Sequence, residues 1–146
     1  MALWKRRLDL DAINRGEGLP CADNMDRWVG LKVTEIGDDY LRATLPVDHR
    51  TKQPFGLLHG GASCVLAESL GSLAANLCLE PGPVVAVGLN IEASHVRSAT
   101  QGIVTATARP LHIGRSTQLW DIKIEDEAQR LVCAVRLTTG VKRLHP

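Results

Sequence analysis

The sequence predicts an α+β fold in which a curved antiparallel β-sheet wraps around one long central helix. Residues 62–79 are rich in Ala and Leu and carry a single charged side chain, Glu68. A helix that is apolar nearly all round must be buried on most sides. Two strand-like segments precede this helix and four follow it. That order fits a sheet curled around a helix and does not fit alternating βαβ units. A chain of 146 residues suffices for one domain with a sizeable core.

The first 27 residues are expected to form an N-terminal extension packed on the main fold, which then occupies residues 28–146. Their apolar residues are unevenly spaced and are interrupted by glycine and proline up to residue 20, so helical signals are weak. Asp23 and Asn24 are of the type that caps helices. A short helix is therefore expected to run from one of them into Trp28.

Alternating apolar and polar residues predict a β-hairpin over residues 31–47. A Gly-Asp-Asp turn at residues 37–39 separates its two strands. In the second strand, Leu41, Ala43, Leu45 and Val47 fall on one face, which we expect to be buried. Pro46 cannot donate a backbone hydrogen bond, so this strand either lies at a sheet edge or ends there.

The central helix is expected to stop before the Pro-Gly-Pro sequence at residues 81–83. Four strands are expected after it, over residues 84–94, 102–111, 117–125 and 131–141. In the third of these, Gln118, Trp120, Ile122 and Ile124 fall on one face.

Composition argues against several kinds of partner. The chain has 17 basic and 16 acidic residues and a net charge of +1, so no basic field is available for nucleic acid. The four cysteines form no C-x-x-C pair and no cluster with histidine, so we expect reduced, mostly buried thiols and no metal site. The basic start is followed by acidic residues and does not resemble a secretory signal, so a cytoplasmic location is expected.

Residues 57–79 are long enough to span a bilayer. However, the segment contains glycine, serine and asparagine, and Glu68 lies near its middle. A lone membrane span seldom tolerates such a carboxylate. A buried helix is favoured, and no membrane partner is expected.

Gly60 and Gly61 fall where this helix is expected to begin. The first N–H groups of a helix lack partners within it and carry partial positive charge. Because glycine has no Cβ, a substrate oxygen can approach that backbone closely, as in an oxyanion hole. The alternative is that the two glycines only let the chain turn into the helix.

Glu68 is the sharper anomaly, because a carboxylate among Val, Leu and Ala is costly unless partners hold its charge. Ser72 lies four residues further on, on the same helix face, and can donate a hydrogen bond to it. Glu68 is therefore a candidate base or nucleophile. The alternative is a structural glutamate bound to nearby backbone or arginine.

Helical rise predicts that the two candidates lie too far apart to act together within one chain. Nine residues separate His59 from Glu68, which corresponds to about 13 Å along a helix. A carboxylate that attacks a carbonyl must come within about 3 Å of it. The simplest solution is a dimer in which each site combines residues from both chains.

Residues 53–63, QPFGLLHGGAS, followed by Glu68, resemble the hotdog-fold acyl-CoA thioesterases. The most similar branch contains the 1,4-dihydroxy-2-naphthoyl-CoA thioesterase of menaquinone synthesis and the proofreading thioesterase of enterobactin synthesis. The resemblance runs from about residue 28 to about residue 139. It implies a helix wrapped by a curved antiparallel sheet, in chains that pair into dimers and usually then into a tetramer.

The resemblance also implies roles for five catalytic positions. Glu68 matches the catalytic carboxylate, which acts as nucleophile or as general base for water. Gly60 matches the residue whose backbone N–H polarises the thioester carbonyl. Gln53 and His59 match side chains that orient the thioester, and Ser72 matches a helper near the attacking water. No cofactor is implied, because a thioester has a good leaving group and needs only an oxyanion donor and a carboxylate.

Five further positions match substrate-binding residues of the family. His95 matches a pocket residue near the acyl group or the pantetheine arm. The other four fall where related enzymes contact the nucleotide end of CoA: Arg97, Arg115, Ser116 and Thr117. The implied partner is an acyl-CoA or acyl-carrier-protein substrate.

Hydrolysis of an acyl-CoA or acyl-carrier thioester is therefore the predicted function, with aryl groups favoured by the branch. One alternative is a hotdog dehydratase or hydratase that acts on 3-hydroxyacyl or enoyl thioesters. The Gln53 and Gly60–Gly61 context does not suit that reaction. A second alternative is a non-catalytic acyl-CoA binding protein, in which a buried Glu68 would have no purpose.

Overall fold

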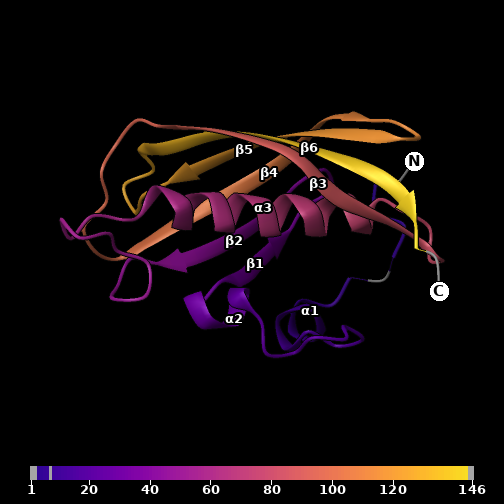
Figure 1. The fold of residues 1–146 in the computed structure, drawn as a ribbon, viewed down its shortest axis with the longest axis horizontal. Coiled ribbons are helices and arrows are strands. Elements are labelled where there is room, and N and C mark those ends of the chain that lie inside the picture. Colours follow the sequence, from indigo (N-terminus) through magenta and orange to yellow (C-terminus); the bar gives the residue numbers. More distant parts are fainter. Residues whose placement is uncertain (1–2, 7, 145–146) are drawn as a thin grey trace.

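The chain folds into one six-stranded antiparallel sheet that curls around helix α3 (Figure 1). The computed structural model describes residues 3–6 and 8–144. Residues 1–2 and 7 of the predicted extension and 145–146 of the predicted domain lie outside them. The helices are α1 (Leu10–Arg15), α2 (Met25–Val29) and α3 (Gly60–Leu77). The strands are β1 (Lys32–Ile36), β2 (Leu41–Pro46), β3 (Val84–His95), β4 (Ile103–Ile113), β5 (Thr117–Glu125) and β6 (Leu131–Arg143).

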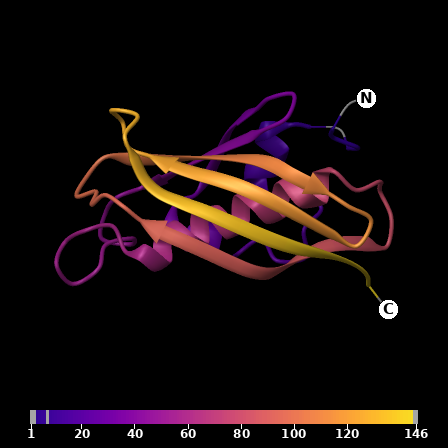
Figure 2. The same ribbon diagram turned by 90° about the horizontal axis from the view of Figure 1, so that it is seen from above.

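The strand order in the sheet is β1-β2-β4-β5-β6-β3, so β1 and β3 are its two edges. Seen from above, β3, β4, β5 and β6 lie over α3 (Figure 2). The predicted α+β fold and all six predicted strands are confirmed. Pro46 is the last residue of β2, which lies between β1 and β4. Of the two explanations for this proline, the strand end is therefore the correct one.

The core lies between α3 and the concave face of the sheet. Leu66, Leu70 and Ala74 of α3 are buried there. Gly71 lets the helix approach the sheet closely, because a Cβ at this position would lie 2.9 Å from Cδ1 of Ile122. The predicted row of Gln118, Trp120, Ile122 and Ile124 is fully buried. The two polar members of that row bond each other, since Trp120 Nε1 donates to Gln118 Oε1 at 3.1 Å.

Helix α3 begins and ends two residues earlier than the apolar run, residues 62–79, from which it was predicted. Its N-cap is His59, whose Nδ1 accepts a hydrogen bond from the Gly61 N–H at 2.8 Å. Histidine is not among the usual cap residues, and the apolar run begins only at residue 62, but the start at Gly60 agrees with the expectation that Gly60 and Gly61 begin the helix. Ala and Leu are not cap residues, so the apolar run itself does not mark the first residue of the helix.

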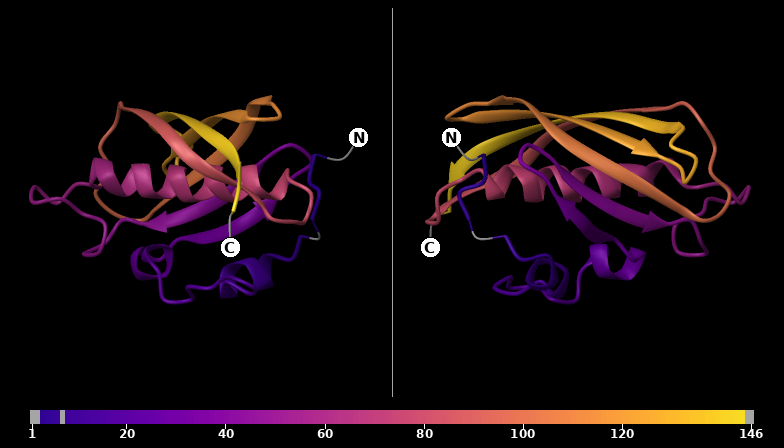
Figure 3. Two further views of the ribbon diagram at one scale, coloured as in Figure 1. Left: turned by 45° about the vertical axis from the view of Figure 1, so that its right-hand side comes forward. Right: turned by 180° about the vertical axis from the view of Figure 1, so that it is seen from behind.

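Helices α1 and α2 lie on the far side of the molecule from strands β3–β6 (Figure 3). Asn24 caps α2 as one of the two predicted candidates. Asn14 of α1 bonds both the N–H and the C=O of Val33 in β1, each at 2.8 Å. Ser69 of α3 donates to Asp26 of α2 at 2.6 Å. The predicted boundary after residue 27 falls inside α2, and the division into extension and domain stays a prediction.

The predictions about a membrane span and about the burial of the cysteines have different outcomes. No helix in the described part of the chain is both long enough and apolar enough to cross a membrane. All four cysteines are free, but only Cys78 and Cys133 are buried, while Cys64 is half-buried and Cys21 is exposed. The prediction of mostly buried thiols is therefore wrong for Cys21, which lies in the loop before α2. Burial raises the pKa of Cys78 and of Cys133 to about 11.

Candidate active site

Four of the predicted site residues line one cavity at the N-terminal end of α3. The cavity has a volume of about 390 Å³, and Gln53, Gly60, His95 and Arg97 contribute to its wall. Gln53 comes from the loop before α3, Gly60 is the first residue of α3, and His95 is the last residue of β3. The fold thus brings Gln53 and Gly60, which lie close in sequence, together with the end of β3, which is distant in sequence.

The start of α3 leaves the Gly60 amide available. The Gly61 N–H is bonded to His59 Nδ1 at 2.8 Å, whereas the Gly60 N–H belongs to the first turn and has no partner within the helix. Because Nδ1 of His59 accepts a hydrogen bond, its neutral ring carries the proton on Nε2. His59 is exposed and so presents an N–H group at the surface beside the helix start.

Gly60 also makes room for His95. A Cβ on Gly60 would lie 3.0 Å from Nε2 of His95, closer than side chains normally approach. The imidazole of His95 therefore lies directly against the backbone of the helix start. The side chain of Gln53 is held by its own loop, since its Oε1 accepts a hydrogen bond from the N–H of Phe55. This bond leaves the amide NH₂ of Gln53 as its remaining donor group.

Glu68 lies two turns further along α3, beside edge strand β3. It is half-buried, so the prediction that α3 is enclosed on most sides does not hold at this residue. Ser72 Oγ donates to Glu68 Oε1 at 3.5 Å, which confirms the predicted contact between the two side chains. The carboxylate lies against Gly88 of β3, where a Cβ would be 3.1 Å from the carboxyl carbon and closer still to Oε1.

The surroundings of Glu68 are partly desolvated. Cys64 precedes it by one helical turn, and burial together with the negative charge of Glu68 raises the pKa of the Cys64 thiol. At neutral pH this cysteine is therefore a neutral neighbour of the carboxylate. Among residues 3–6 and 8–144, no group of three or more His, Cys, Asp or Glu side chains is placed to hold a metal ion.

The structure does not bring Glu68 and the Gly60 amide together within one chain. Both lie on the same straight helix, and their separation of eight residues corresponds to about 12 Å along its axis. Ser72 lies beyond Glu68 and is further still from the helix start. The predicted catalytic residues therefore form two groups, one at the mouth of α3 and one in its middle.

The predicted CoA-contacting residues are also divided. Arg97 follows the end of β3, beside the mouth of α3. Thr117 begins β5 and pairs with Gly140 of β6, which pairs with Val87 near the start of β3. Arg115, Ser116 and Thr117 therefore lie at the opposite end of the sheet from Arg97 (Figure 1). One chain alone cannot place both groups on the same nucleotide.

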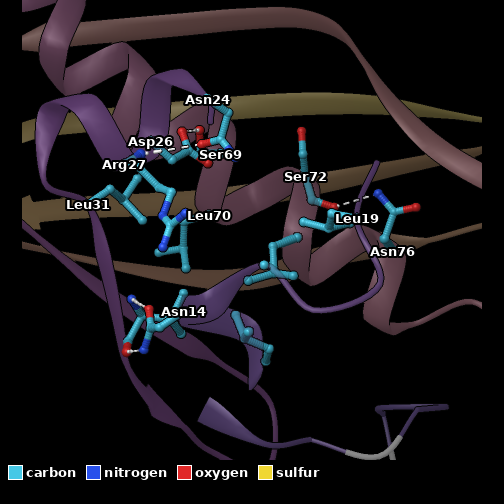
Figure 4. Close-up of a pocket in the computed structure, with 14 residues that line it drawn as sticks. Asn14, Leu19, Asn24, Asp26, Arg27, Leu31, Ser69, Leu70, Ser72 and Asn76 are labelled. Atoms are coloured by element: carbon cyan, nitrogen blue, oxygen red, sulfur yellow. Dashed lines mark hydrogen bonds between the residues drawn. The ribbon is translucent and has the colours of Figure 1, made fainter. Parts of the chain in front are cut away.

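A second cavity lies between α3 and the N-terminal helices (Figure 4). Its volume is about 290 Å³. Ser72 contributes to its wall and also bonds Glu68, so the cavity begins beside the carboxylate. Leu19, Leu31 and Leu73 are among the apolar residues of its wall.

Sequence reasoning missed Gly88 and the N-terminal residues that line this second cavity. A glycine inside a predicted strand is a recognised sign of a bulge or of close backbone approach. The pairing of β3 with β6 does shift register between Gly88 and Asn90. That signal could have identified Gly88. No comparable signal marks Asp26, because its contact with Ser69 spans 43 residues of sequence.

The thioesterase superfamily matches residues 55–133 of the chain. The chain is 54% identical to the 1,4-dihydroxy-2-naphthoyl-CoA hydrolase of Escherichia coli over 140 residues, which is 95% of this chain and 98% of that protein. It is 48% identical to the proofreading thioesterase EntH of Cronobacter turicensis over 139 residues, 95% of this chain and 98% of that protein.

Among solved structures, a thioesterase from Haemophilus influenzae superposes with a TM-score of 0.92 at 44% identity, covering 99% of this chain and 97% of that one. The sheet, the central helix and the N-terminal helices are therefore shared with that enzyme over nearly the whole length. The resemblance seen in residues 53–63 extends across the chain. The chain belongs to the thioesterase superfamily and is a thioester hydrolase with the hotdog fold.

Proposed function

We propose that this enzyme hydrolyses aryl-CoA thioesters, with Glu68 as the catalytic carboxylate and the Gly60 N–H of a second copy as the oxyanion donor. The observation that carries the proposal is the placement of Glu68. Its carboxylate is half-buried, accepts a hydrogen bond from Ser72 and lies against Gly88 at the edge of the sheet. It thus faces the side of the molecule on which a second chain can approach.

The edge strand supports assembly into a dimer. β3 is 12 residues long and has a sheet neighbour on one side only, β6. Long unpaired edges are normally covered in native proteins. Pairing of β3 with its copy would bring a second chain beside Glu68 and would supply the Gly60 amide that its own helix holds about 12 Å away. Two such dimers forming a tetramer is the assembly that the family resemblance implies.

Two chemical routes use these groups. As a general base, Glu68 removes a proton from water, the water oxygen bonds to the acyl carbon, the C–S bond breaks and the thiolate takes the proton. As a nucleophile, a Glu68 oxygen bonds to the acyl carbon, the thiolate leaves, and water then cleaves the resulting anhydride. In both routes the Gly60 N–H stabilises negative charge on the carbonyl oxygen.

The relatives support an aryl substrate. One is a hydrolase of 1,4-dihydroxy-2-naphthoyl-CoA and another is a proofreading thioesterase. We therefore place an aryl group on the thioester, carried by CoA or by an acyl-carrier protein. His95 and Gln53 line the cavity beside the Gly60 amide and are assigned to the thioester and pantetheine arm. The free cysteines suit the reducing cytoplasm, in which we place the reaction.

The decisive experiment is thiol release from aryl-CoA by the Glu68→Gln variant. We expect turnover to fall by about 100- to 10,000-fold, the range for loss of a positioned acid or base. Glu80→Gln, an exposed glutamate after α3, is the matched control and should retain full activity. A folded Glu68→Gln enzyme with unchanged turnover would remove the carboxylate from the mechanism.

The same assay separates the two alternatives. A dehydratase or hydratase would change the absorbance of an enoyl-CoA without releasing free thiol. A non-catalytic binding protein would bind aryl-CoA and medium-chain acyl-CoA tightly and release thiol from neither. For the hydrolase, ¹⁸O found on Glu68 after a single turnover in ¹⁸O-water identifies the nucleophilic route, because it requires that water attack the Glu68 carbonyl carbon of the anhydride.

A further inference from the structure

The cavity between α3 and the N-terminal helices is built partly by residues that lie outside the superfamily match at 55–133. Ser72 connects it to the reaction centre, since this side chain both lines the cavity and bonds Glu68. An acyl carbon held at Glu68 would therefore direct its substituent past Ser72 and into this cavity. This route would make the acyl group of the substrate the occupant of the cavity.

The size of the cavity favours an aromatic occupant. A closed apolar cavity of about 150 Å³ accepts one benzene molecule. The cavity here measures about 290 Å³ and so has room for one or two fused rings. Leu19, Leu31 and Leu73 are on the cavity wall and provide apolar contacts for such a ring.

Most polar side chains on the cavity wall are already used within the protein. The amide of Asn76 donates to the C=O groups of Ser72 and Ala86 and accepts from the N–H of Ala86. Asn14 both donates to and accepts from the backbone of Val33. These amides hold elements together and have little capacity left for a ligand.

The side chain of Asn24 is also occupied by hydrogen bonds within the protein, whereas the carboxylate of Asp26 keeps acceptor positions for a ligand. The Asn24 side chain accepts from the Arg27 N–H and donates to the Cys21 C=O. Asp26 accepts from Ser69 Oγ at 2.6 Å through Oδ1, which fixes the orientation of its carboxylate. A carboxylate offers about four acceptor positions on two oxygens, so Asp26 can accept further hydrogen bonds from a group inside the cavity (Figure 4).

We propose that Asp26 is a specificity-determining residue that accepts a hydrogen bond from a hydroxyl group on an aromatic acyl substrate. The inference rests on the proposed function and deepens it, because it assigns a residue that recognises the acyl group. Ser69 is the positioning residue that holds Asp26. The N-terminal helices thereby select the acyl group, while α3 supplies the chemistry.

The test compares kcat/KM for hydroxylated and unhydroxylated substrates in the native enzyme and in Asp26→Asn. The substrates are benzoyl-CoA with its 2-, 3- and 4-hydroxy forms, 2-naphthoyl-CoA with its 1,4-dihydroxy form, and octanoyl-CoA. We expect the native enzyme to prefer at least one hydroxylated form over its parent by about 10- to 100-fold, as for a hydrogen bond to a charged group. In Asp26→Asn this ratio should fall towards one while the parent rate is retained.

The control variant is Asp23→Asn. Asp23 precedes the same short helix but accepts its hydrogen bond from Trp28 and is not on the cavity wall, so its variant should keep the native ratio. Ser69→Ala should lower the ratio as well, because Asp26 loses the bond that orients it. An equal loss on hydroxylated and parent substrates in Asp26→Asn would overturn the inference, as would a native preference for octanoyl-CoA.

Failure of the inference is distinguishable from failure of the proposed function. If the native enzyme releases thiol from aryl-CoA substrates but ignores their hydroxyl groups, the role of Asp26 is wrong and the hydrolase assignment stands. If it releases thiol from none of these substrates, the aryl-CoA hydrolase proposal itself is overturned.

Discussion

At the scale of single residues, the position of the Glu68 carboxylate depends on a missing side chain. Gly88 has no Cβ, and the carboxylate occupies the space where one would be. The register shift that follows Gly88 in β3 is the kind of bulge that often re-aims a side chain near an active site. Gly88 is therefore a positioning residue for Glu68, whereas Ser72 contacts the carboxylate directly.

Replacement of Gly88 by alanine should impair catalysis more than folding. The added methyl group would displace the carboxylate, and a shift of about 1 Å can cost on the order of 100-fold in rate. We expect kcat for aryl-CoA to fall by about 10- to 100-fold with little change in KM or in melting temperature.

Gly82→Ala is the matched control for this variant. A Cβ on Gly82 would have no neighbour within 4 Å, so this substitution should leave both kcat and stability unchanged. If Gly88→Ala turned over at the native rate, the carboxylate would not depend on this glycine for its position.

Glu68 and Ser72 were predictable from sequence because the evidence for them is local. A charge within an apolar helical run is visible in a single segment, and a spacing of four residues places two side chains on one face. Gly88 and Asp26 gain their importance from α3, which is distant in sequence. Their contacts depend on how β3 and α2 pack on the helix, and no local pattern specifies that packing.

At the scale of secondary-structure elements, one amide joins the central helix to the edge strand. Asn76 of α3 donates to the Ala86 C=O of β3 at 2.9 Å and accepts from the Ala86 N–H at 3.0 Å. It therefore takes the place of one residue of a neighbouring strand. This pair of hydrogen bonds lies two residues before Gly88 and fixes this part of β3 relative to Glu68.

Asn76→Ala should destabilise the protein by leaving the Ala86 backbone groups without their partner. The cost of an unsatisfied buried polar group is about 1–3 kcal/mol, and we expect the free energy of unfolding in urea to fall by that amount. Gln101→Ala, in the exposed loop before β4, is the control and should change it by less than about 0.5 kcal/mol. Equal stability of the native and Asn76→Ala proteins would contradict the importance of this pair of hydrogen bonds.

The elements themselves were largely predictable, whereas their order in the sheet was not. Alternation over residues 41–47 and 117–125 identified strands because one face of each packs on α3. The placement of β3 beside β6 rather than beside β4 results from pairing over long sequence distances. The two-residue offset between the apolar run and the start of α3 has a local cause, the His59 cap.

At the scale of the whole molecule, each chain carries the two groups of the proposed catalytic site at separate places. The Gly60 amide and the Glu68 carboxylate lie about 12 Å apart along one helix. The open edge of β3 lies beside Glu68 and can accept a second copy. A symmetric dimer would then contain two sites, each with one half from each chain.

Two inactive variants should therefore restore each other. Gly60→Pro removes the oxyanion N–H while fitting the first position of a helix, and the extended His59 backbone (ψ 131°) suits a residue that precedes proline. In a mixed dimer of Gly60→Pro and Glu68→Gln, one site is intact and the other lacks both groups. Random mixing should restore about a quarter of native activity per chain, since half of the C₂ dimers are mixed and half of their sites work.

The measurement is thiol release after the two variants are unfolded and refolded together, compared with each variant refolded alone. Activity no higher than the sum of the separate variants would show that each chain assembles its own site. Sedimentation of the refolded mixture confirms that dimers or tetramers have formed.

The N-terminal helices have an evolutionary consequence. Their cavity-lining residues lie before residue 55, outside the segment that the superfamily shares, whereas Gly60, Glu68 and Gly88 lie within it. Mutations in the first 30 residues can therefore remodel the wall of this cavity while the proposed catalytic residues stay unchanged. Paralogues that diverge in this way could accept new acyl groups and keep the same hydrolytic reaction.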